Sequence, residues 1–319
     1  MILFNLLIFA IGAVVLWFAA GLVISGVNRF SRSVRISKFA TSFLLLGLLT
    51  SIGEISVGIN SILDKKPEIF VGNLIGGSFV ILLFIVPILA IFGRGITLGQ
   101  YLQPKKLSFF LVLIVAPSFL ILDGYVSRYD GLLLILLYGL FFNLFQKSEK
   151  LLEKPDLKQM NVPQTEYNLA KIVIGAILIF LASKILVDKT IYFASILEIP
   201  PFMISILILS IGTNLPELII AANSIKNKQK SIAFGDYIGS AATNSLLFGT
   251  LVLIYGPFEV ASNGFDFTLF ILLLGYICFF SFAHSRKHLS LMQGVVLIVI
   301  YLFFFLVQTT EIFLASPKI

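Results

Sequence analysis

Long apolar runs separated by short polar segments dominate this chain of 319 residues. Several runs approach the roughly 20 residues that a helix needs to cross the hydrocarbon core of a bilayer. Hydrophobic residues make up 58% of the sequence and charged residues 12%, which is too little polar surface for a soluble domain. The pattern predicts an all-α, polytopic membrane protein. Its ten predicted spans cover residues 2–24, 39–63, 69–92, 107–122, 131–146, 169–187, 202–225, 231–255, 265–283 and 289–308.

Basic residues gather in alternate connections between these spans. Most of the 23 Lys and Arg residues follow the first, third, fifth, seventh and ninth spans. Cytoplasmic connections carry such an excess, so we expect both termini on the non-cytoplasmic side, with the cell membrane as the location. The charge of +7 therefore reflects membrane topology, and no nucleic-acid partner is expected. Cys278 is the single cysteine and lies in an apolar run, which excludes a disulfide framework and a cysteine-rich metal site.

An internal repeat divides the chain into two halves. The polar stretch 147–168 is interpreted as a cytoplasmic linker between a first five-helix repeat, 1–146, and a second, 169–319. An odd number of spans in each half places the halves in opposite orientations, an inverted repeat typical of secondary transporters. Residues matched at an offset of 163 include Thr50 with Thr213, Glu54 with Glu217, Asn60 with Asn223, Gly72 with Gly235 and Gly76 with Gly239.

The matched acidic segments carry the candidate chemistry. A carboxylate within a membrane span is costly and marks a functional site. In each copy a threonine precedes the glutamate by four residues, so both side chains share one helical face. Proline at position 216 kinks the second copy and frees a backbone carbonyl. The candidate ligands in these segments are Thr50, Ser51, Glu54, Thr213, Asn214 and Glu217.

Oxygen atoms of carboxylates, hydroxyls and amides suit calcium or sodium and suit soft metals poorly. Two carboxylates would neutralise one divalent ion. Without a cation they should repel each other until one takes up a proton. The pattern therefore predicts a site between the halves that exchanges one divalent cation for monovalent cations or protons.

Glycine-rich segments open the third and eighth predicted spans, at 72–77 and 235–240. Glycines at this spacing allow close helix packing in a membrane, which accounts for the glycines themselves. It does not account for polar residues at matched positions. Asn73, Asp236, Ser240 and Asn244 are predicted as further ligands or ligand supports, with Asp236 alternatively bracing the start of its helix.

The paired segments resemble the α-repeats of the cation/calcium exchanger superfamily, which includes the sodium/calcium exchangers. Gly-Thr-Asn-Leu-Pro-Glu at 212–217 and Gly-Asp-Tyr-Ile-Gly-Ser at 235–240 are similar to the family motifs G-T-S-L-P-E and G-N-x-I-G-S. The resemblance implies a ten-helix antiporter that exchanges calcium for sodium by alternating access. It implies calcium coordination by Glu54 and Glu217, with Thr50 and Thr213 beside them, and sodium ligands at Ser51, Asn214 and Ser240.

The first copy departs from the family pattern at several positions. In the second copy, Asn244 occupies a position where the family often has an acidic residue. The departures in the first copy are Leu49, Gly53, Gly77 and Ile81. They leave open a proton-coupled or other-cation exchanger, and a non-transporting membrane relative with a degenerate ion site. The paired acids argue against a passive channel. The sequence has no nucleotide loop and no nucleophile–base arrangement, so neither enzyme activity nor a cofactor other than the transported cations is expected.

Lys184 lies near the end of the sixth predicted span. We interpret it as a side chain that extends to the membrane interface, with a role as a built-in cation near the ion pathway as the alternative.

Overall fold

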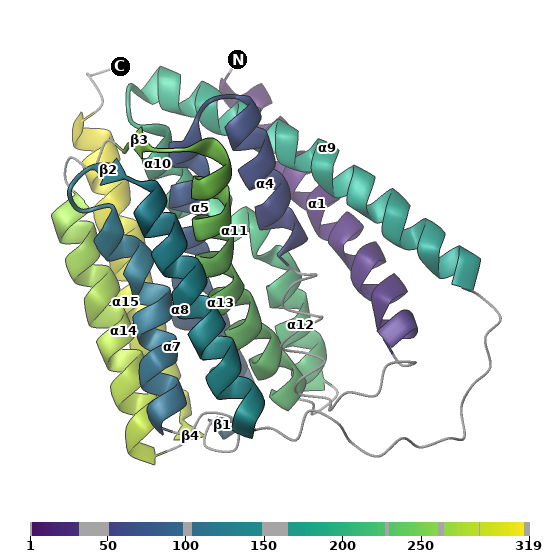
Figure 1. The fold of residues 1–319 in the computed structure, drawn as a ribbon, viewed down its shortest axis with the longest axis vertical. Coiled ribbons are helices and arrows are strands. Elements are labelled where there is room, and N and C mark those ends of the chain that lie inside the picture. The colour runs from purple at the N-terminus through teal and green to yellow at the C-terminus, as the bar shows by residue number, and fades with distance from the viewer. Residues whose placement is uncertain are drawn as a thin grey trace.

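The computed structural model describes residues 2–31, 51–97, 104–148, 165–226, 230–260, 265–286 and 288–315. Within these residues the chain is a bundle of helices with short two-residue strands at its ends (Figure 1). The helices of the first half are α1 (Ile2–Ser31), α4 (Ile52–Leu63), α5 (Pro67–Val80), the π-helix η2 (Ile81–Ile85), α6 (Val86–Phe92), α7 (Pro104–Leu120) and α8 (Arg128–Ser148). Those of the second half are α9 (Thr165–Leu197), α10 (Pro201–Ile204), the π-helix η3 (Ser205–Leu209), α11 (Ser210–Thr213), α12 (Leu215–Lys226), α13 (Lys230–Tyr255), α14 (Phe265–Arg286) and α15 (Leu291–Ala315).

Each predicted span coincides with a helix or a consecutive series of helices, although residues 39–50 lie outside the described part. Five described helical segments are long and apolar enough to cross a membrane, and the bent series α10 to α12 makes six. Large apolar side chains such as Leu3, Leu136 and Phe270 are exposed on the outer helices, as contact with lipid requires. The prediction of a polytopic helical membrane protein is confirmed, whereas the number of ten spans stays a prediction.

Both chain termini lie at one end of the bundle (Figure 1). The other end holds the end of α6 and the start of α7, the end of α12 and the start of α13, and the end of α14 and the start of α15. That second end carries Lys105 at the start of α7 and Lys226 at the end of α12. Two termini at the same end agree with an even number of membrane crossings. The side of the membrane that each end faces stays a prediction.

Two short antiparallel ladders join the two halves. β1 (Ile96–Thr97) pairs with β4 (His288–Leu289), and β2 (Tyr125–Val126) pairs with β3 (Phe258–Glu259), with Ile96 opposite Leu289 and Tyr125 opposite Glu259. At the repeat offset β2 coincides with β4, and β1 falls one residue from β3. Exchanging the halves therefore turns one ladder into the other, and the ladders lie at opposite ends of the bundle (Figure 1). Two repeats in opposite orientation account for this arrangement.

The starts of α8 and α15 repeat the same capping pattern at the same offset. The Ser127 N–H donates to Asp130 Oδ2 at 2.7 Å, and the Asp130 N–H donates to Ser127 Oγ at 3.3 Å. The Ser290 N–H donates to Gln293 Oε1 at 2.9 Å, and the Gln293 N–H donates to Ser290 Oγ at 3.3 Å. Such reciprocal bonds satisfy backbone donors that have no partner within the helix. The repeat thus extends to the last helix of each half.

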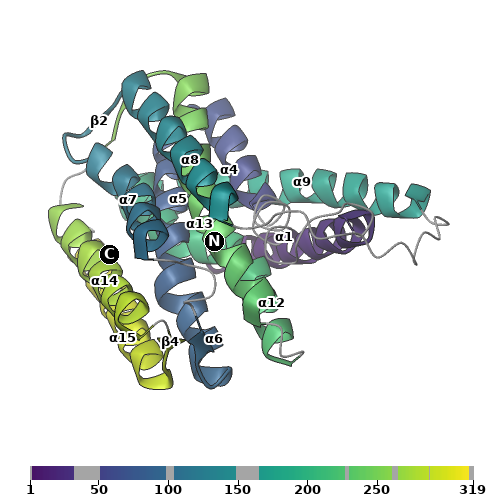
Figure 2. The same cartoon turned by 60° about the horizontal axis from the view of Figure 1, so that its bottom comes forward.

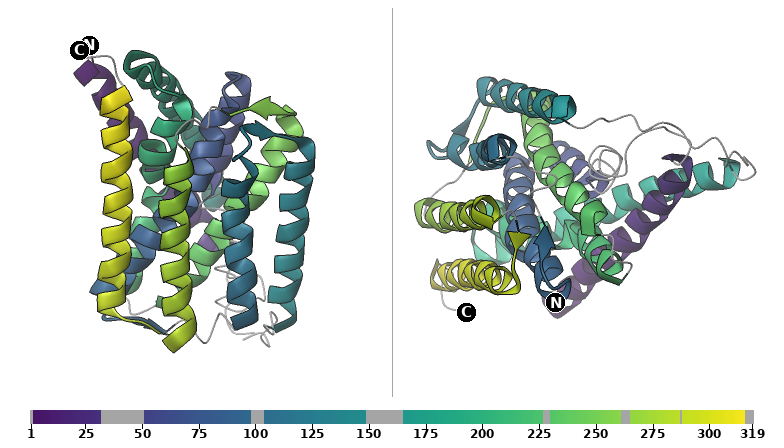
Figure 3. Two further views of the ribbon diagram at one scale, coloured as in Figure 1. Left: turned by 90° about the vertical axis from the view of Figure 1, so that its left-hand side faces the viewer. Right: turned by 90° about the horizontal axis from the view of Figure 1, so that it is seen from below.

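α1 and α9 pack together as a unit on the side of the bundle opposite α14 and α15 (Figures 2 and 3). Their buried apolar contacts form a cluster of their own, which contains Phe9, Ala13, Leu16, Val57, Ile69, Ala182, Leu186, Val187 and Leu209. α1 also approaches the acidic segments of both halves. A Cβ added at Gly53 would lie 3.4 Å from a Leu16 methyl, and one at Gly212 would lie 3.8 Å from the Ala13 Cβ. α1 therefore covers the segments on which the candidate ligands lie.

Candidate cation site

The backbone breaks at the acidic segment of the second half, and a helix begins at the acidic segment of the first. In the second half α11 ends at Thr213, Asn214 leaves the helical conformation, and α12 begins at Leu215 with a bend of 43°. Pro216 has no N–H, so the carbonyl four residues earlier loses its usual helical donor. In the first half α4 begins at Ile52, directly after Ser51. The starts of α4 and α12 place polar side chains inside the protein, where they can surround a charge.

Helix α5 of the first half packs closely against the broken series of the second half. A Cβ at Gly72 would lie 2.6 Å from the Phe202 carbonyl oxygen, and one at Gly76 would overlap the Ile206 carbonyl oxygen. Ser205 Oγ also donates to the carbonyl of Ile69. Glycine is therefore required on this face of α5 because backbone meets backbone there. The prediction that Gly76 serves close helix packing is confirmed.

Ser240 connects Glu217 to the opposite half. Its Oγ donates to Glu217 Oε1 at 2.9 Å and lies 3.4 Å from Ser51 Oγ. All three side chains are buried. The hydroxyl of Tyr237 donates to the Glu217 backbone carbonyl at 3.3 Å and fixes the start of α12 against α13. The inverted repeat therefore brings these ligand candidates from the two halves into one polar cluster.

Thr213 and Asn214 form the second part of this cluster. Thr213 Oγ1 donates to Asn73 Oδ1 at 3.1 Å, which links the broken helix to α5. Asn214 Nδ2 donates to the Ser210 carbonyl at 2.8 Å. The amide oxygen of Asn214 has no hydrogen-bond partner among the described residues, although it is fully buried. An oxygen in that state is available to a cation.

Glu54 is the most exceptional group of the site. It is 1% exposed, and neither carboxylate oxygen has a hydrogen-bond partner of ordinary geometry among the described residues. Two further acids, Glu217 and Asp236, repel its negative charge, and the Thr213 hydroxyl lies within reach of its carboxylate. Burying a carboxylate without a partner costs several kcal/mol, and acidic neighbours add to that cost. A bound cation offsets both penalties.

Asp236 and Asn244 lie on the same helix, α13, and both are buried. α13 begins at Lys230, so Asp236 sits inside the helix, and the interpretation that it braces the helix start is wrong. Asn244 Nδ2 lies 3.3 Å from Ser78 Oγ, while its Oδ1 has no hydrogen-bond partner in the described part of the chain. The amide groups of Asn214 and Asn244 both lie next to Gly77. A Cβ added at Gly77 would lie 3.0 Å from Asn214 Nδ2 and 3.1 Å from Asn244 Nδ2.

One predicted ligand, Thr50, lies outside the described residues. The structure brings the other predicted ligands into one buried region, as the contacts above describe. No group of three or more His, Cys, Asp or Glu side chains in the described ranges is arranged to hold a metal ion. Cation binding here would therefore depend on hydroxyl, amide and carbonyl oxygens in addition to the carboxylates.

Sequence reasoning missed three polar contributors to the cluster. These are Ser78, Ser210 and Tyr237. Ser78 and Ser210 have Ala241 and Gly47 at the matched repeat positions, so the repeat gave no signal for them. Tyr237 lies inside the glycine motif, but only the packing of α12 on α13 shows where its hydroxyl points.

The sequence pattern of the sodium/calcium exchanger protein family matches residues 4–146 and 167–310. The chain belongs to this family. The sodium/calcium exchanger MaX1 of Methanosarcina acetivorans is 24% identical over 96% of this chain and 99% of its own length.

Two solved structures share the exchanger fold with this chain. The sodium-calcium exchanger NCX_Mj superposes with a TM-score of 0.67 at 20% identity, covering 95% of this chain and 98% of its own. The H+/Ca2+ exchanger CAX superposes with a TM-score of 0.74 at 15% identity, covering 98% of this chain and 88% of its own. At these identities the likeness establishes the fold, and the coupling ion has to be inferred from the residues of this exchanger-family chain.

Lys184 lies on α9 and bridges to the end of α4. Its Nζ lies 2.6 and 2.5 Å from the two oxygens of Asp64 and 2.9 Å from Asp188 Oδ1. One turn earlier Asn60 Nδ2 donates to Ser183 Oγ at 2.9 Å. Lys184 therefore has a more specific role than extension to the interface, because it fastens the α1–α9 unit to α4.

Proposed function

We propose that this protein is a secondary active antiporter that exchanges calcium, or a similar divalent cation, for sodium by alternating access. The observation that carries the proposal is the pair Glu54 and Glu217. The two buried acids come from opposite halves and meet within one cluster of hydroxyl and amide oxygens. Family membership supports the same function.

The charge of the pair suits a divalent ion. Calcium takes about six to eight oxygen ligands at about 2.3–2.6 Å. The proposed ligands are Glu54, Glu217, Thr50, Thr213, Ser51, Asn214, Ser240, Asn244 and Asp236. The unpartnered oxygens of Glu54, Asn214 and Asn244 are buried, so a dehydrated cation could bind them without competition from internal donors. Sodium ions would bind the same oxygens in turn, and competition for one site couples the two fluxes.

Alternating access follows from the inverted repeat. α1 approaches the acidic segments of both halves, beside Gly53 and beside Gly212. Movement of the α1–α9 unit relative to the rest would open one end while covering the other. We infer that residues 1–146 and 169–319 are the two repeats, joined by a cytoplasmic linker at 147–168. We also infer that both termini lie on the non-cytoplasmic side of the cell membrane, which a reporter fused to each terminus would check.

Isotopic calcium uptake into vesicles with an imposed sodium gradient tests the proposal. Uptake should follow the gradient and should be lost in Glu217→Gln, because the amide removes the charge that Ser240 orients. Glu259→Gln is a matched control, because Glu259 is exposed on β3 outside the site. Calcium uptake that ignores the gradient and survives Glu217→Gln would refute the proposal.

Proton coupling is the second candidate, and the first repeat favours it. Gly77 and Ile81 supply no side-chain oxygens where their repeat mates are Ser240 and Asn244. A site with fewer neutral oxygens binds sodium less well, while Glu54 still has an unpartnered carboxylate that can carry a proton. Calcium uptake driven by a proton gradient in sodium-free vesicles would select this mechanism. Calcium binding without flux under either gradient would identify a non-transporting relative.

A further inference from the structure

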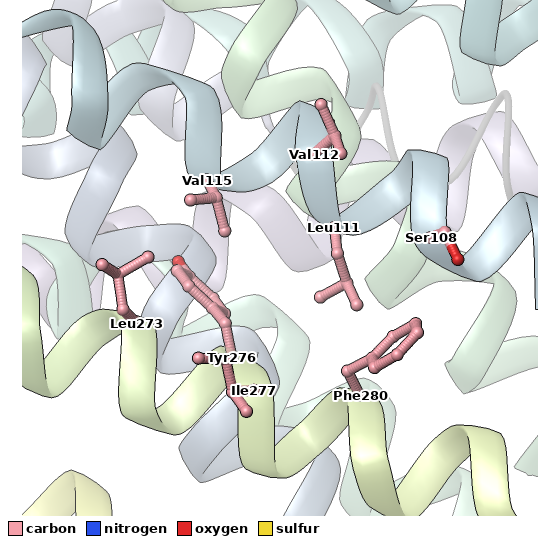
Figure 4. Close-up of a pocket in the computed structure, with 8 residues that line it drawn as sticks. All are labelled: Ser108, Leu111, Val112, Val115, Leu273, Tyr276, Ile277 and Phe280. Atoms are coloured by element: carbon pink, nitrogen blue, oxygen red, sulfur yellow. The ribbon is translucent and has the colours of Figure 1, made fainter.

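An apolar cavity of about 310 Å³ lies between α7 and α14, and none of the candidate cation ligands lines it (Figure 4). The two helices lie on the side of the bundle remote from α1 and α9 (Figures 2 and 3). The residues that line the cavity are Ser108, Leu111, Val112 and Val115 of α7, and Leu273, Tyr276, Ile277 and Phe280 of α14. Apart from two hydroxyl groups this lining is apolar.

The cavity opens toward the surrounding membrane and runs along the helices. Val112 and Ile277 form its rims and are 55% and 61% exposed. The lining residues of α7 run from Ser108 to Val115, which corresponds to about two helical turns or roughly 10 Å. Figure 4 shows Ser108 and Phe280 at one end of this trough and Val115 and Leu273 at the other. An apolar trough of this length, with exposed apolar rims, would accept part of a hydrocarbon chain.

The end near Ser108 and Phe280 leads to titratable side chains on both helices. Lys105 precedes Ser108 by three residues, and His284 follows Phe280 by four, so each lies on the same helical face as the trough. The His284 ring stacks on the Phe280 ring with centroids 5.4 Å apart. Lys105 and His284 are both exposed. They lie where α7 begins and α14 ends, at the end of the bundle opposite the termini.

From this placement we propose that the trough binds one acyl chain of an anionic phospholipid, whose phosphate group lies beside Lys105 and His284. Basic residues at the mouth of a cleft between membrane helices recognise anionic headgroups, and the apolar trough holds the attached chain. A zwitterionic lipid would gain the apolar contacts but lose the net charge attraction.

Tyr276 connects this lipid site to the helix that bears Gly77. Its ring forms the floor of the trough and packs edge-on against Phe79 of α5, with centroids 5.7 Å apart. Phe79 is two residues from Gly77. Gly275 of α14 also approaches α5 and η2, because a Cβ there would overlap Leu83 and lie 3.0 Å from Phe79. A bound chain would therefore brace α14 against the segment that carries the ion site.

Native mass spectrometry of the purified full-length protein tests the proposal with two probes, phosphatidylglycerol and phosphatidylcholine of the same acyl composition. Val112→Trp fills the trough from its exposed rim, and Leu136→Trp is the matched control on α8, where Leu136 is also exposed. We expect one phosphatidylglycerol to be retained by the parent and by the control. Retention should fall at least fivefold in Val112→Trp.

The headgroup contact is tested separately by Lys105→Gln, which leaves the trough unchanged. A lysine near an anionic lipid surface contributes about fivefold in affinity, so phosphatidylglycerol binding should weaken by about that factor and phosphatidylcholine binding should not change. Lys105→Arg should restore it. Equal retention of both lipids, or retention unaffected by Val112→Trp, would overturn the proposal. A lipid-free dimer that Val112→Trp dissociates would assign the trough to a second copy of the chain and overturn it as well.

Discussion

The two halves of the candidate cation site each begin a helix near a buried glutamate and differ in the side chains around it. In the second half Thr213, Asn214 and Glu217 each take part in a hydrogen bond to a buried group. In the first half the oxygens of Glu54 have no such partner, and Gly77 provides no side chain at all. Amides of Asn214 and Asn244, both from the second half, reach the surface of Gly77.

This difference shows that two copies of a repeat can share their acids and differ in the neutral groups around them. Packing of α5 against the broken series brings Asn73 and Gly77 beside Thr213 and Asn214. The neutral groups differ between the copies. Where the first half has Gly77, the amides of Asn214 and Asn244 from the second half fill the adjacent space. The comparison predicts that loss of a carboxylate weakens calcium binding most. Loss of a neutral group should weaken it less, and least where that group makes the longest hydrogen bond.

The largest effect is expected from Glu54→Gln. A ligand at a hundred times its Kd stabilises a folded protein by about 2.7 kcal/mol, and this stabilisation by calcium should disappear in the variant. Without cations the variant should be more stable than the parent, because an uncharged amide replaces a buried carboxylate that lacks a partner. Thermal unfolding with cations titrated one at a time measures both effects. Glu68→Gln serves as control, and an unchanged calcium shift in Glu54→Gln would remove Glu54 from the site.

A smaller effect is expected from Ser240→Ala. A hydrogen bond to a charged group contributes about 1.5–3 kcal/mol, so calcium binding should weaken by tenfold or more. Ser51→Ala should weaken it less, because Ser51 Oγ lies 3.4 Å from Ser240 Oγ, a longer contact than the 2.9 Å between Ser240 Oγ and Glu217 Oε1. Isothermal titration of calcium into both variants measures the two losses of affinity. A larger loss in Ser51→Ala than in Ser240→Ala would mean that groups of the first half contribute more to calcium binding.

Gly77→Ala should destabilise the protein by about 1–3 kcal/mol, because the added methyl meets two amides in a packed interior. Combining it with Asn244→Ala should recover part of the loss, since the second change makes room. A double-mutant cycle of unfolding free energies measures this coupling. Additive effects would show that Asn244 does not occupy the space beside Gly77.

The smallest effect concerns the bridge from α9 to α4. The repeat mates of Ser183 and Lys184 are Ala20 and Gly21 of α1, so the first half has no equivalent polar residues there. The side chains of Lys184 and Asp64 are 39% and 22% exposed, and such pairs contribute about 0.2–1 kcal/mol. Lys184→Met should therefore change stability little. The effect of Lys184→Met should appear in transport, as a change in the ratio of the calcium transport rates in the two directions across the membrane. An unchanged ratio would argue against a role of Lys184 in movement of α1 and α9.

The sequence was sufficient for the helices and for locating the two acids that the structure buries together. Apolar runs mark the helices because lipid leaves few alternatives for the backbone, and the repeat marks Glu54 and Glu217 because both copies retain them. It did not reveal the π-helices η2 and η3, whose residues look like ordinary apolar helix. Nor did it reveal the bond of Thr213 to Asn73, or the approach of two amides to Gly77, since both arise from packing between distant segments.

The cross-half ladders also have a consequence for biosynthesis. β1 and β2 are made early, but their partners at residues 258–259 and 288–289 are made last. Strand edges of the first half therefore stay open while the second half is still being translated. Because domains fold in the order in which they emerge, the first half cannot reach its final state alone. A ribosome that stopped before residue 258 would release a chain with both of these edges unpaired, a feature that favours aggregation and recognition by quality control.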